Sequence, residues 1–445
     1  MKSCKELRDE IFKLIKEYSE AENMEKKDWI KGQRIPYASR VFDENERLNL
    51  IDSALDFWLT AGKYAEKFEN EFANYLGVRY AYAVSSGSAA NLLAFMALTS
   101  PLLKNRRILP GDEVITVAAA FPTTVAPIIQ YGAVPVFVDI NIPSYNIDCS
   151  YLEQALTEKT RAVFVAHTLG IPFDIKRIKS FCEEHGLWLI EDNCDALGAE
   201  VFIDGEWRKT GTIGDIGTSS FYPAHQMTMG EGGAVYTNNP TLAKIMLSMR
   251  DWGRDCVCPP GKDNTCGHRF DMQYGKLPKG YDHKYVYSHF GYNLKITEMQ
   301  AAIGCAQLAK LPGFAEARRN NWLRLRKGLE CLKDHIMLPE EQENTKISPF
   351  GFMVTMKNSM LDRDAIVAYL EERGVQTRML FAGNIIKHPC FDTIRDTNAY
   401  RIVSSLENTD KIMEHSFFVG VYPGITVKQM DWMIESFKEF FKEVL

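Results

Sequence analysis

Short apolar segments alternate with amphipathic segments between about residues 80 and 237, and this alternation limits the fold more than any other feature. Segments such as AVPVFVDI and RAVFVAH are apolar along their whole length, as strands covered on both faces are. The stretch IKRIKSFCEEHG, which lies before the next apolar segment, has the spacing of a helix. Buried strands connected by helices form parallel sheets, so we predict an α/β protein with a mostly parallel central sheet.

The chain is too long for one core. It has 445 residues, and a single core stops growing at roughly 250–300 residues. We therefore expect an N-terminal helical segment over residues 1–50, a large domain over 51–310 and a smaller α/β domain over 311–445. Within the large domain, residues 251–289 are rich in Gly, Pro, Lys, Asp and Cys and lack periodicity, which predicts a long ordered insertion. Insertions of this kind are usually functional.

The charge balance and the hydropathy pattern exclude two classes of partner. The formal net charge is −6, which provides no general basic surface for nucleic acid. The chain has no run of about 18 apolar residues, so we expect no membrane-spanning helix. The N-terminal stretch is charged and lacks the apolar region of a signal peptide. We therefore expect a cytoplasmic protein whose thiols stay reduced.

A serine- and glycine-rich turn, SSGS at residues 85–88, lies between a predicted strand and a predicted helix. Gly87 allows the backbone to turn tightly, and the following amide groups point out of the helix N-terminus. This geometry suits an anion such as a phosphate, which makes Gly87 and Ser88 candidate phosphate ligands. Many ordinary strand–helix turns have the same composition, and both interpretations stay open for the turn alone.

Two further segments carry polar groups where α/β enzymes bind ligands. Asp192 ends the apolar segment LWLIED, and a carboxylate there can keep a heterocyclic nitrogen protonated, although an N-cap or a surface turn explains it equally well. His225 and Tyr222 lie in a turn just before the glycine-rich segment GEGGAV. A single histidine is usually structural, so the interpretation of His225 depends on the pattern as a whole.

That pattern resembles, in order and spacing, the sugar aminotransferase and dehydratase family of vitamin B6 enzymes, over about residues 50–445. The resemblance implies the type I fold of aspartate aminotransferase, with a seven-stranded central sheet. In the aminotransferases of the family, the position of His225 is a lysine that binds the cofactor covalently. Histidine there is typical of the 3-dehydratase branch, which uses pyridoxamine 5′-phosphate. The motifs that carry the resemblance are SSGSAAN, GDEVITVAAAFPTT, VPVFVDI, IEDNCDALGA, SFYPAHQMTMGEGGAV and GYNLKITEMQAAIGCAQL.

The 3-dehydratase branch implies specific roles for the polar residues. The cofactor amine forms an imine with a 4-keto sugar, His225 takes a proton from the C4′ atom of the cofactor, and the hydroxyl group at C3 leaves. Imidazole titrates near neutral pH, so a neutral base is available. Asp192 on the ring nitrogen keeps the ring electron-poor. Tyr222 and Asp195 could support the base, although core packing of Tyr222 and helix capping by Asp195 are alternatives.

The resemblance also assigns the cofactor phosphate. Gly87 and Ser88 match the phosphate turn, and Ser220 matches a hydroxyl donor to the same phosphate. Asn293 matches an asparagine that reaches the phosphate in the neighbouring subunit, which implies a homodimer with shared active sites; an N-terminal helix turn is the alternative.

Two positions on the substrate side depart from the family pattern or match it loosely. The residue that stacks on the cofactor ring is aromatic in many members, but here that position is alanine, and Phe121 two residues later is the candidate in its place. Arg378 is a candidate for the nucleotide diphosphate because arginine binds phosphate well, although a solvated arginine fits the sequence equally well.

Four of the ten cysteines have a spacing that requires explanation. Cys256, Cys258 and Cys266 lie in the insertion, and Cys194 lies two residues beyond Asp192. Four thiolates can bind an iron–sulfur cluster or zinc, and the spacing does not choose between them or exclude unligated thiols. The arrangement resembles the iron–sulfur subclass of these dehydratases, which carries a 2Fe–2S cluster.

The iron–sulfur subclass implies a particular reaction. Its substrate is CDP-4-keto-6-deoxy-D-glucose, which is deoxygenated at C3 in 3,6-dideoxyhexose biosynthesis for lipopolysaccharide O-antigens. The electrons come one at a time through the cluster from a separate NAD(P)H-dependent flavin and iron–sulfur reductase. This chain has no G-x-G-x-x-G motif of its own for a nicotinamide cofactor. The alternatives are a dTDP-4-keto-sugar 3-dehydratase, a cluster-independent 3-dehydratase in which glutamate restores the cofactor amine, and a non-catalytic regulator.

Overall fold

A central sheet of eight strands organises the computed structural model, which describes every residue except 259, 260, 266, 358–361 and 445. The sheet is parallel except for β9, which runs antiparallel to both of its neighbours. The strands, in spatial order, are β1 (Tyr80–Val84), β9 (Gly233–Thr237), β8 (Ile216–Ser220), β5 (Trp188–Asp192), β4 (Thr160–Ala166), β2 (Glu113–Val117), β3 (Val134–Val138) and β14 (Arg401–Ile402).

The mostly parallel α/β sheet confirms the sequence prediction, with two differences in detail. The sequence IGTSS of β8 was not predicted as a strand because small and hydroxyl side chains replace the apolar ones there, yet all five residues are buried. The eighth strand, β14, has two residues and comes from the C-terminal part of the chain, where it pairs with the edge of β3. The other seven strands of the sheet all precede residue 238.

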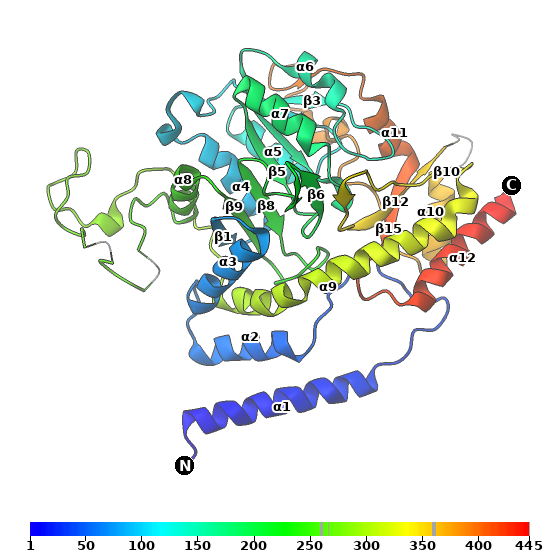
Figure 1. The fold of residues 1–445 in the computed structure, drawn as a ribbon, viewed down its shortest axis with the longest axis horizontal. Coiled ribbons are helices and arrows are strands. Elements are labelled where there is room, and N and C mark those ends of the chain that lie inside the picture. The colour runs from blue at the N-terminus through cyan, green and yellow to red at the C-terminus, as the bar shows by residue number, and fades with distance from the viewer. Residues whose placement is uncertain (259–260, 266, 358–361, 445) are drawn as a thin grey trace.

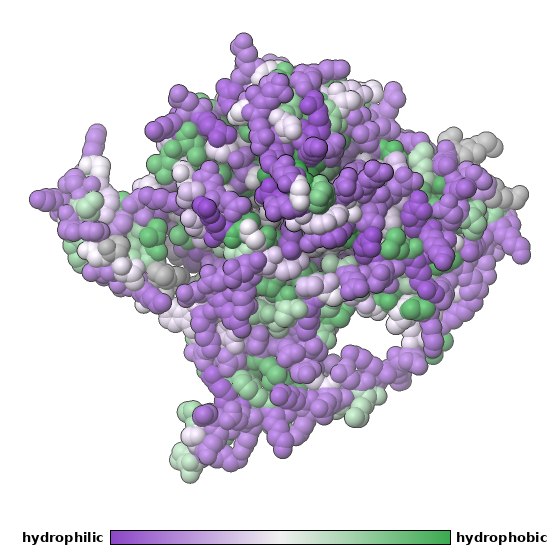
Figure 2. Space-filling model, viewed as in Figure 1, coloured by the Kyte–Doolittle hydropathy of each residue, from purple (hydrophilic) through white to green (hydrophobic). Residues whose placement is uncertain are grey.

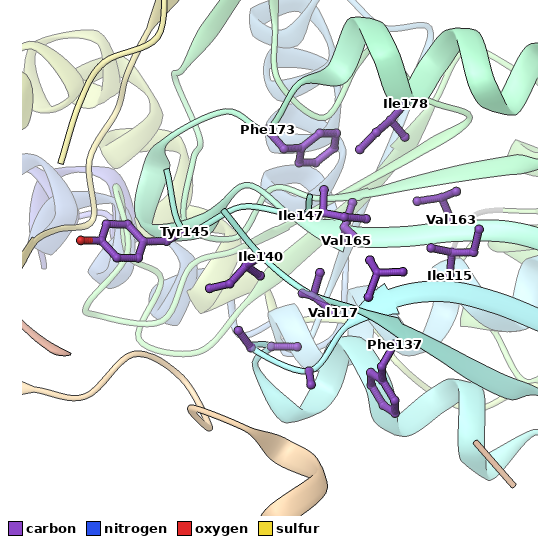
Figure 3. Packing of buried hydrophobic residues seen from close by; sticks show 14 of the residues in the cluster. Ile115, Val117, Phe137, Ile140, Tyr145, Ile147, Val163, Val165, Phe173 and Ile178 are labelled. Atoms are coloured by element: carbon purple, nitrogen blue, oxygen red, sulfur yellow. The ribbon is translucent and has the colours of Figure 1, made fainter. Parts of the chain in front are cut away.

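Helices cover both faces of this sheet. Val163 and Val165 of β4 belong to one apolar cluster and the alternate residues of the strand to another, as expected when successive side chains point to opposite faces. Figure 3 shows the first cluster, in which Ile178 packs near Val163 and Val165. The flanking helices are α4 (Gly87–Leu98), α5 (Pro122–Gln130), α6 (Leu152–Ala155), α7 (Ile175–His185) and α8 (Pro240–Arg250).

The C-terminal part forms a second, antiparallel sheet with its own apolar cluster. The strands in spatial order are β10 (Ile336–Met337), β12 (Gly351–Met356), β15 (Ser416–Gly420) and β13 (Thr377–Arg378), and the helices are α10 (Arg363–Glu372), α11 (Glu407–His415) and α12 (Val427–Val444). The long helix α9 (Glu298–Leu329) runs from the first sheet to the second (Figure 1). Residue 310, where the sequence suggests a domain boundary, lies inside α9, and that division stays a prediction.

A third, small sheet connects the two parts of the molecule. In it, β11 (Thr345–Lys346) from the C-terminal part pairs with β6 (Glu200–Ile203), which also pairs with β7 (Glu206–Lys209). The backbone between β11 and β12 also contacts the loop after β4, where the Phe350 amide donates to the Leu169 carbonyl at 2.9 Å.

The N-terminal helices are α1 (Cys4–Glu25), α2 (Glu44–Asp56) and α3 (Lys63–Leu76). The helical periodicity of residues 5–25 and 63–76 predicted α1 and α3. Ser3 and Glu6 form a capping box that starts α1. Helix α1 packs against α2 at the periphery, and α2 packs against α9 (Figure 1).

The insertion projects from the body of the molecule beside α8 (Figure 1). In its described residues the longest regular element is one short turn of 3₁₀-helix, His283–Tyr285. Ion pairs hold its loops together, including Arg269 with Asp282 and His283 with Asp255. The face in Figure 2 is mostly hydrophilic, with hydrophobic residues in small separate patches. No helix in the described part of the chain has the length and apolar character that crossing a membrane requires.

Candidate active site

A cavity of about 420 Å³ lies at the carboxyl ends of the central strands, where open α/β sheets bind their ligands. The turn after β1 and the ends of β4, β5 and β8 provide one side, and the C-terminal part provides Phe350, Arg378 and Phe418. The predicted residues that line the cavity are Gly87, Ser88, Phe121, Asp192, Cys194, Asp195, Ser220, Tyr222, His225 and Arg378. The fold therefore brings together ten positions that are scattered over almost 300 residues of sequence.

The phosphate turn has the predicted geometry. Ser86 caps α4 by accepting a hydrogen bond from the Ala89 amide at 3.0 Å, and Gly87 begins the helix. A methyl group at Gly87 would collide with Ser220, 2.8 Å from its Oγ atom, and would lie 3.1 Å from the Sγ atom of Cys194. A residue without a side chain is therefore required where the helix N-terminus meets β8. The helix N-terminus beside the Ser220 hydroxyl forms a site suited to an anion.

The carboxylate of Asp192 is held in one orientation. Its Oδ2 atom accepts hydrogen bonds from Asn91 Nδ2 at 2.7 Å and from Thr124 Oγ1 at 2.8 Å. Thr218 donates in turn to the Oδ1 atom of Asn91 at 2.7 Å, which fixes the amide. The Cys194 amide donates to the other carboxylate oxygen at 3.2 Å. Such a buried, hydrogen-bonded carboxylate is suited to pair with a protonated ring nitrogen.

His225 and Asp195 meet at the inner wall of the cavity. The Nδ1 atom of His225 lies 3.5 Å from Asp195 Oδ1, and the imidazole ring packs against Phe350 with ring centres 5.3 Å apart. Burial and the nearby charge of Arg318 lower the pKa of His225 to about 3. Burial and the charge of Asp192 raise the pKa of Asp195 to about 8. At neutral pH the pair therefore consists of a neutral imidazole and a protonated carboxyl group.

Tyr222 and Phe121 lie on the open side of the cavity. Both side chains are half exposed, which removes core packing as an explanation for Tyr222. Phe121 contacts Phe381 edge to face, and like Ala166 at the end of β4 it lines the cavity. Phe121 and Ala166 are apolar groups of the kind that can pack against a planar ring.

Asn293 does not line the cavity of its own chain. Its backbone pairs with Asp251 in an isolated bridge, and its Oδ1 atom accepts a weak hydrogen bond of 3.4 Å from the Lys295 amide. The predicted phosphate contact is therefore not made within one chain.

The four predicted cluster cysteines do not form one site in the described residues. Cys194 faces the active-site cavity, whereas Cys256 and Cys258 line a different cavity of about 600 Å³ beside Trp58 and α8. Cys266 lies outside the described residues. No group of three or more His, Cys, Asp or Glu side chains in the described part of the chain could hold a metal ion.

The surroundings of these thiols differ as well. Burial and the charge of Asp192 raise the pKa of the Cys194 thiol well above its ordinary value, so the thiolate that binds metal is disfavoured there. Cys258 accepts a hydrogen bond from Thr265 at 3.0 Å. The described residues thus do not fit the predicted 2Fe–2S cluster as a ligand set.

Several residues of the site were not predicted. Asn91 lies four positions after Gly87, so a helix places both on one face, and this spacing could have identified it. Thr124 lies next to the predicted Phe121 region, at the start of α5. Thr218 and Arg318 carry no local signal, because their contacts join segments that are far apart in sequence.

Comparisons with known proteins agree with this geometry. The model of the DegT/DnrJ/EryC1/StrS aminotransferase family matches residues 42–438. The chain is 49% identical over 437 residues to the lipopolysaccharide biosynthesis protein RfbH of Salmonella typhimurium, covering 98% of each chain. It is 50% identical over 401 residues to the dTDP-4-dehydro-2,6-dideoxy-D-glucose 3-dehydratase of Saccharopolyspora spinosa, covering 90% of this chain and 85% of the relative.

A solved structure resembles the whole fold. The E. coli GDP-4-keto-6-deoxy-D-mannose-3-dehydratase with bound hydrated PLP superimposes with a TM-score of 0.80 at 30% identity, covering 91% of this chain and 99% of the other. The type I fold predicted from the sequence is therefore confirmed.

Proposed function

The chain belongs to the DegT/DnrJ/EryC1/StrS aminotransferase family, and from this premise we propose that it is a nucleotide-sugar 3-dehydratase dependent on pyridoxamine 5′-phosphate. One observation carries the proposal. His225 projects into the cavity, and none of the described residues that line the cavity is a lysine. An aminotransferase requires a lysine to hold its cofactor covalently. Here the cofactor would have to be bound without a covalent bond.

The cavity fits pyridoxamine 5′-phosphate. Gly87, Ser88 and Ser220 would hold the phosphate, because a helix N-terminus and two hydroxyl groups meet there. Asp192 would hold the protonated ring nitrogen, and Phe121 would lie against the ring. When bound, the cofactor supplies an amine for the keto carbon of the sugar and a ring that accepts electrons.

His225 is suited to move one proton within this site. The neutral imidazole can accept the proton from C4′ of the cofactor. Because burial disfavours the imidazolium, His225 would not retain the proton but would pass it to the hydroxyl group that leaves from C3. The two transfers balance, and one water molecule is released. Asp195, whose carboxyl group lies 3.5 Å from Nδ1, would orient the imidazole rather than balance its charge, because that carboxyl group is protonated at neutral pH.

The substrate is proposed to be a 4-keto-6-deoxy sugar bound to CDP, with the dTDP sugar as the alternative. The relatives support a nucleotide sugar in general, since they include 3-dehydratases for dTDP- and GDP-linked sugars. Arg378 supports binding of the diphosphate, because its guanidinium lies over the Tyr37 ring at 4.3 Å at the cavity wall. Asn293 supports a homodimer with shared sites, since it does not reach the cavity of its own chain.

The proposal has two forms, which differ in how the reaction cycle closes. In the first, four cysteines bind a 2Fe–2S cluster that receives electrons from a separate NAD(P)H-dependent reductase; the resemblance of Cys194, Cys256, Cys258 and Cys266 to the cysteines of the iron–sulfur subclass supports this form. In the second, the cysteines are not ligands and glutamate restores the cofactor amine. The lack of a three-ligand group in the described residues supports the second form.

Reconstitution of the full-length protein under anaerobic conditions tests the proposal. The protein is incubated with pyridoxamine 5′-phosphate, with and without iron and sulfide, and bound cofactor and iron are measured. It is then assayed with CDP-, dTDP- and GDP-linked 4-keto-6-deoxy sugars. We expect cofactor binding and loss of water from the CDP sugar. No cofactor binding would indicate a non-catalytic protein, and an amino-sugar product would indicate an aminotransferase.

The cysteine variants separate the two forms. If the cluster form holds, Cys258→Ala removes the bound iron but leaves cofactor binding and the dehydration step. Cys331→Ala, which changes an exposed thiol in the 3₁₀ turn just after α9, serves as the matched control and should retain the iron. If the wild-type protein takes up no iron and dehydration proceeds with glutamate, the second form is correct.

A further inference from the structure

Arg318 is a buried cation in the middle of α9, with only 1% of its surface exposed. Its Nη2 group donates hydrogen bonds to the carbonyl oxygens of Ala224, at 3.2 Å, and His225, at 2.8 Å. Its Nη1 group lies 3.4 Å from the carbonyl oxygens of both Pro349 and Phe350. All the hydrogen bonds that the structure gives this side chain therefore end on backbone carbonyls.

This use of a buried arginine is unusual, because buried charges are ordinarily paired with an opposite charge. None of the ion pairs among the described residues includes Arg318. The carbonyl oxygens that the guanidinium contacts instead belong to the two segments that flank the proposed base. Ala224 and His225 form the turn that carries the imidazole, and Phe350 packs against that imidazole.

We propose that Arg318 is a positioning residue. It fixes the backbone of His225 relative to the backbone of Phe350, so that the imidazole points into the cavity. This inference rests on the proposed function. The planar guanidinium is suited to this task because its N–H donors lie on two nitrogen atoms that can reach two segments at once. The ammonium group of a lysine has one nitrogen and cannot do this equally well. Gln226 reinforces the same junction, because its Nε2 atom donates to the Ser348 carbonyl at 2.9 Å.

Positioning has a large effect on proton transfer. A displacement of about 1 Å at a reacting group costs on the order of 100-fold in rate. We therefore expect Arg318→Met to lower the rate of hydrogen exchange at C4′ about 100-fold, with little change in the KM for the nucleotide sugar or in the affinity for pyridoxamine 5′-phosphate. Arg318→Lys keeps the charge and one donor group, and it should recover part of the lost rate.

The next residue provides a matched control. Arg319 lies on the same helix but pairs with Glu341 near the surface, and it does not contact the site. Arg319→Met should retain the wild-type rate. A second readout does not depend on activity: in the cofactor-free protein, the NMR signals of the His225 ring, assigned with His225→Asn, should shift in Arg318→Met and stay in place in Arg319→Met.

The outcomes distinguish the inference from the proposed function. If Arg318→Met exchanges C4′ hydrogen at the wild-type rate, or leaves the His225 signals unchanged, the inference is wrong. If both Arg318 variants lose cofactor binding and exchange by the same factor, Arg318 is merely structural and the inference is also wrong. If the wild-type protein exchanges no C4′ hydrogen although it binds the cofactor, the proposed function fails, and the NMR comparison still decides whether Arg318 positions His225.

Discussion

The imidazole of His225 and the carboxyl group of Asp195 lie 3.5 Å apart, although each belongs to a different loop of the central sheet. Asp195 follows β5 and His225 follows β8, and these strands are parallel neighbours. Parallel strands end at the same edge of a sheet, so the order of the strands brings the pair together. The pKa of His225 is lowered to about 3 and that of Asp195 is raised to about 8, which leaves both groups uncharged at neutral pH.

His225→Asn should lower the rate of exchange of the C4′ hydrogen on the order of 1,000-fold, while cofactor binding is retained. Asparagine approximates the shape of the imidazole but cannot accept the proton. Exchange is measured by deuterium incorporation in the presence of the nucleotide sugar, and His415→Asn, which changes a histidine of α11 outside the cavity, is the control. If the variant still exchanges, the base is another residue, and Tyr222, which lines the same cavity, is the first to examine.

Asn91→Leu should weaken binding of pyridoxamine 5′-phosphate about tenfold, because it removes a hydrogen bond of 2.7 Å to the Asp192 carboxylate. The affinity is measured by titration of the cofactor absorbance. In a background of Asp192→Asn, the same change should have little further effect, since the two residues act through one contact. Additive losses in this double-mutant cycle would contradict a role for Asn91 in orienting Asp192.

Gly87→Ala should destabilise the cofactor-free protein by about 1–3 kcal/mol, because the added methyl group meets Ser220 and Cys194 in a packed junction. Thermal or denaturant unfolding measures this effect. The pair Gly87→Ala with Ser220→Gly should recover part of the stability, since it removes the colliding side chain. Gly313→Ala, at an open position of α9, should be neutral or slightly stabilising. A Gly87→Ala protein as stable as the wild type would show that the junction is loose.

Glu191→Gln should lower the free energy of unfolding by about 3 kcal/mol at neutral pH. Burial alone would raise the pKa of Glu191, but hydrogen bonds from His167 and from the backbone amides of Gly211 and Gly214 outweigh it and lower the pKa below 4.5. The unfolded chain therefore binds a proton at higher pH than the folded protein does, so stability falls as the pH drops through the folded pKa.

The pH dependence checks this assignment. Denaturant unfolding at pH 7 and between pH 5 and about 3 should give a steeper loss of stability in the wild type than in Glu191→Gln. Glu206→Gln, at an exposed position of β7, should change the stability by less than about 0.5 kcal/mol and keep the wild-type slope. Parallel wild-type and Glu191→Gln curves would mean that the pKa of Glu191 is the same in the folded and unfolded states.

Much of this fold could be predicted because its strands are buried on both faces, which requires apolar sequences that stand out. The prediction failed at β8, whose small residues fit between β5 and β9 without being apolar. Gly87 and Asp192 could be identified because one follows a predicted strand and the other ends one, whereas His225 was identified only by the resemblance to the family. Arg318 could not be predicted, since it lies 93 positions from His225 and such a separation leaves no local pattern. The resemblance predicted a common site for Cys194, Cys256, Cys258 and Cys266, and the described residues, which do not include Cys266, form no such site.

The edge strand β14 has a consequence for the synthesis of the protein. The ribosome delivers residues 134–138 of β3 long before residues 401–402, so the edge of β3 has no strand beside it on that side until the chain is almost complete. An unpaired strand edge is a site of aggregation. We therefore expect nascent chains and C-terminally truncated products to aggregate more readily than the full-length protein, in which β14 covers part of this edge.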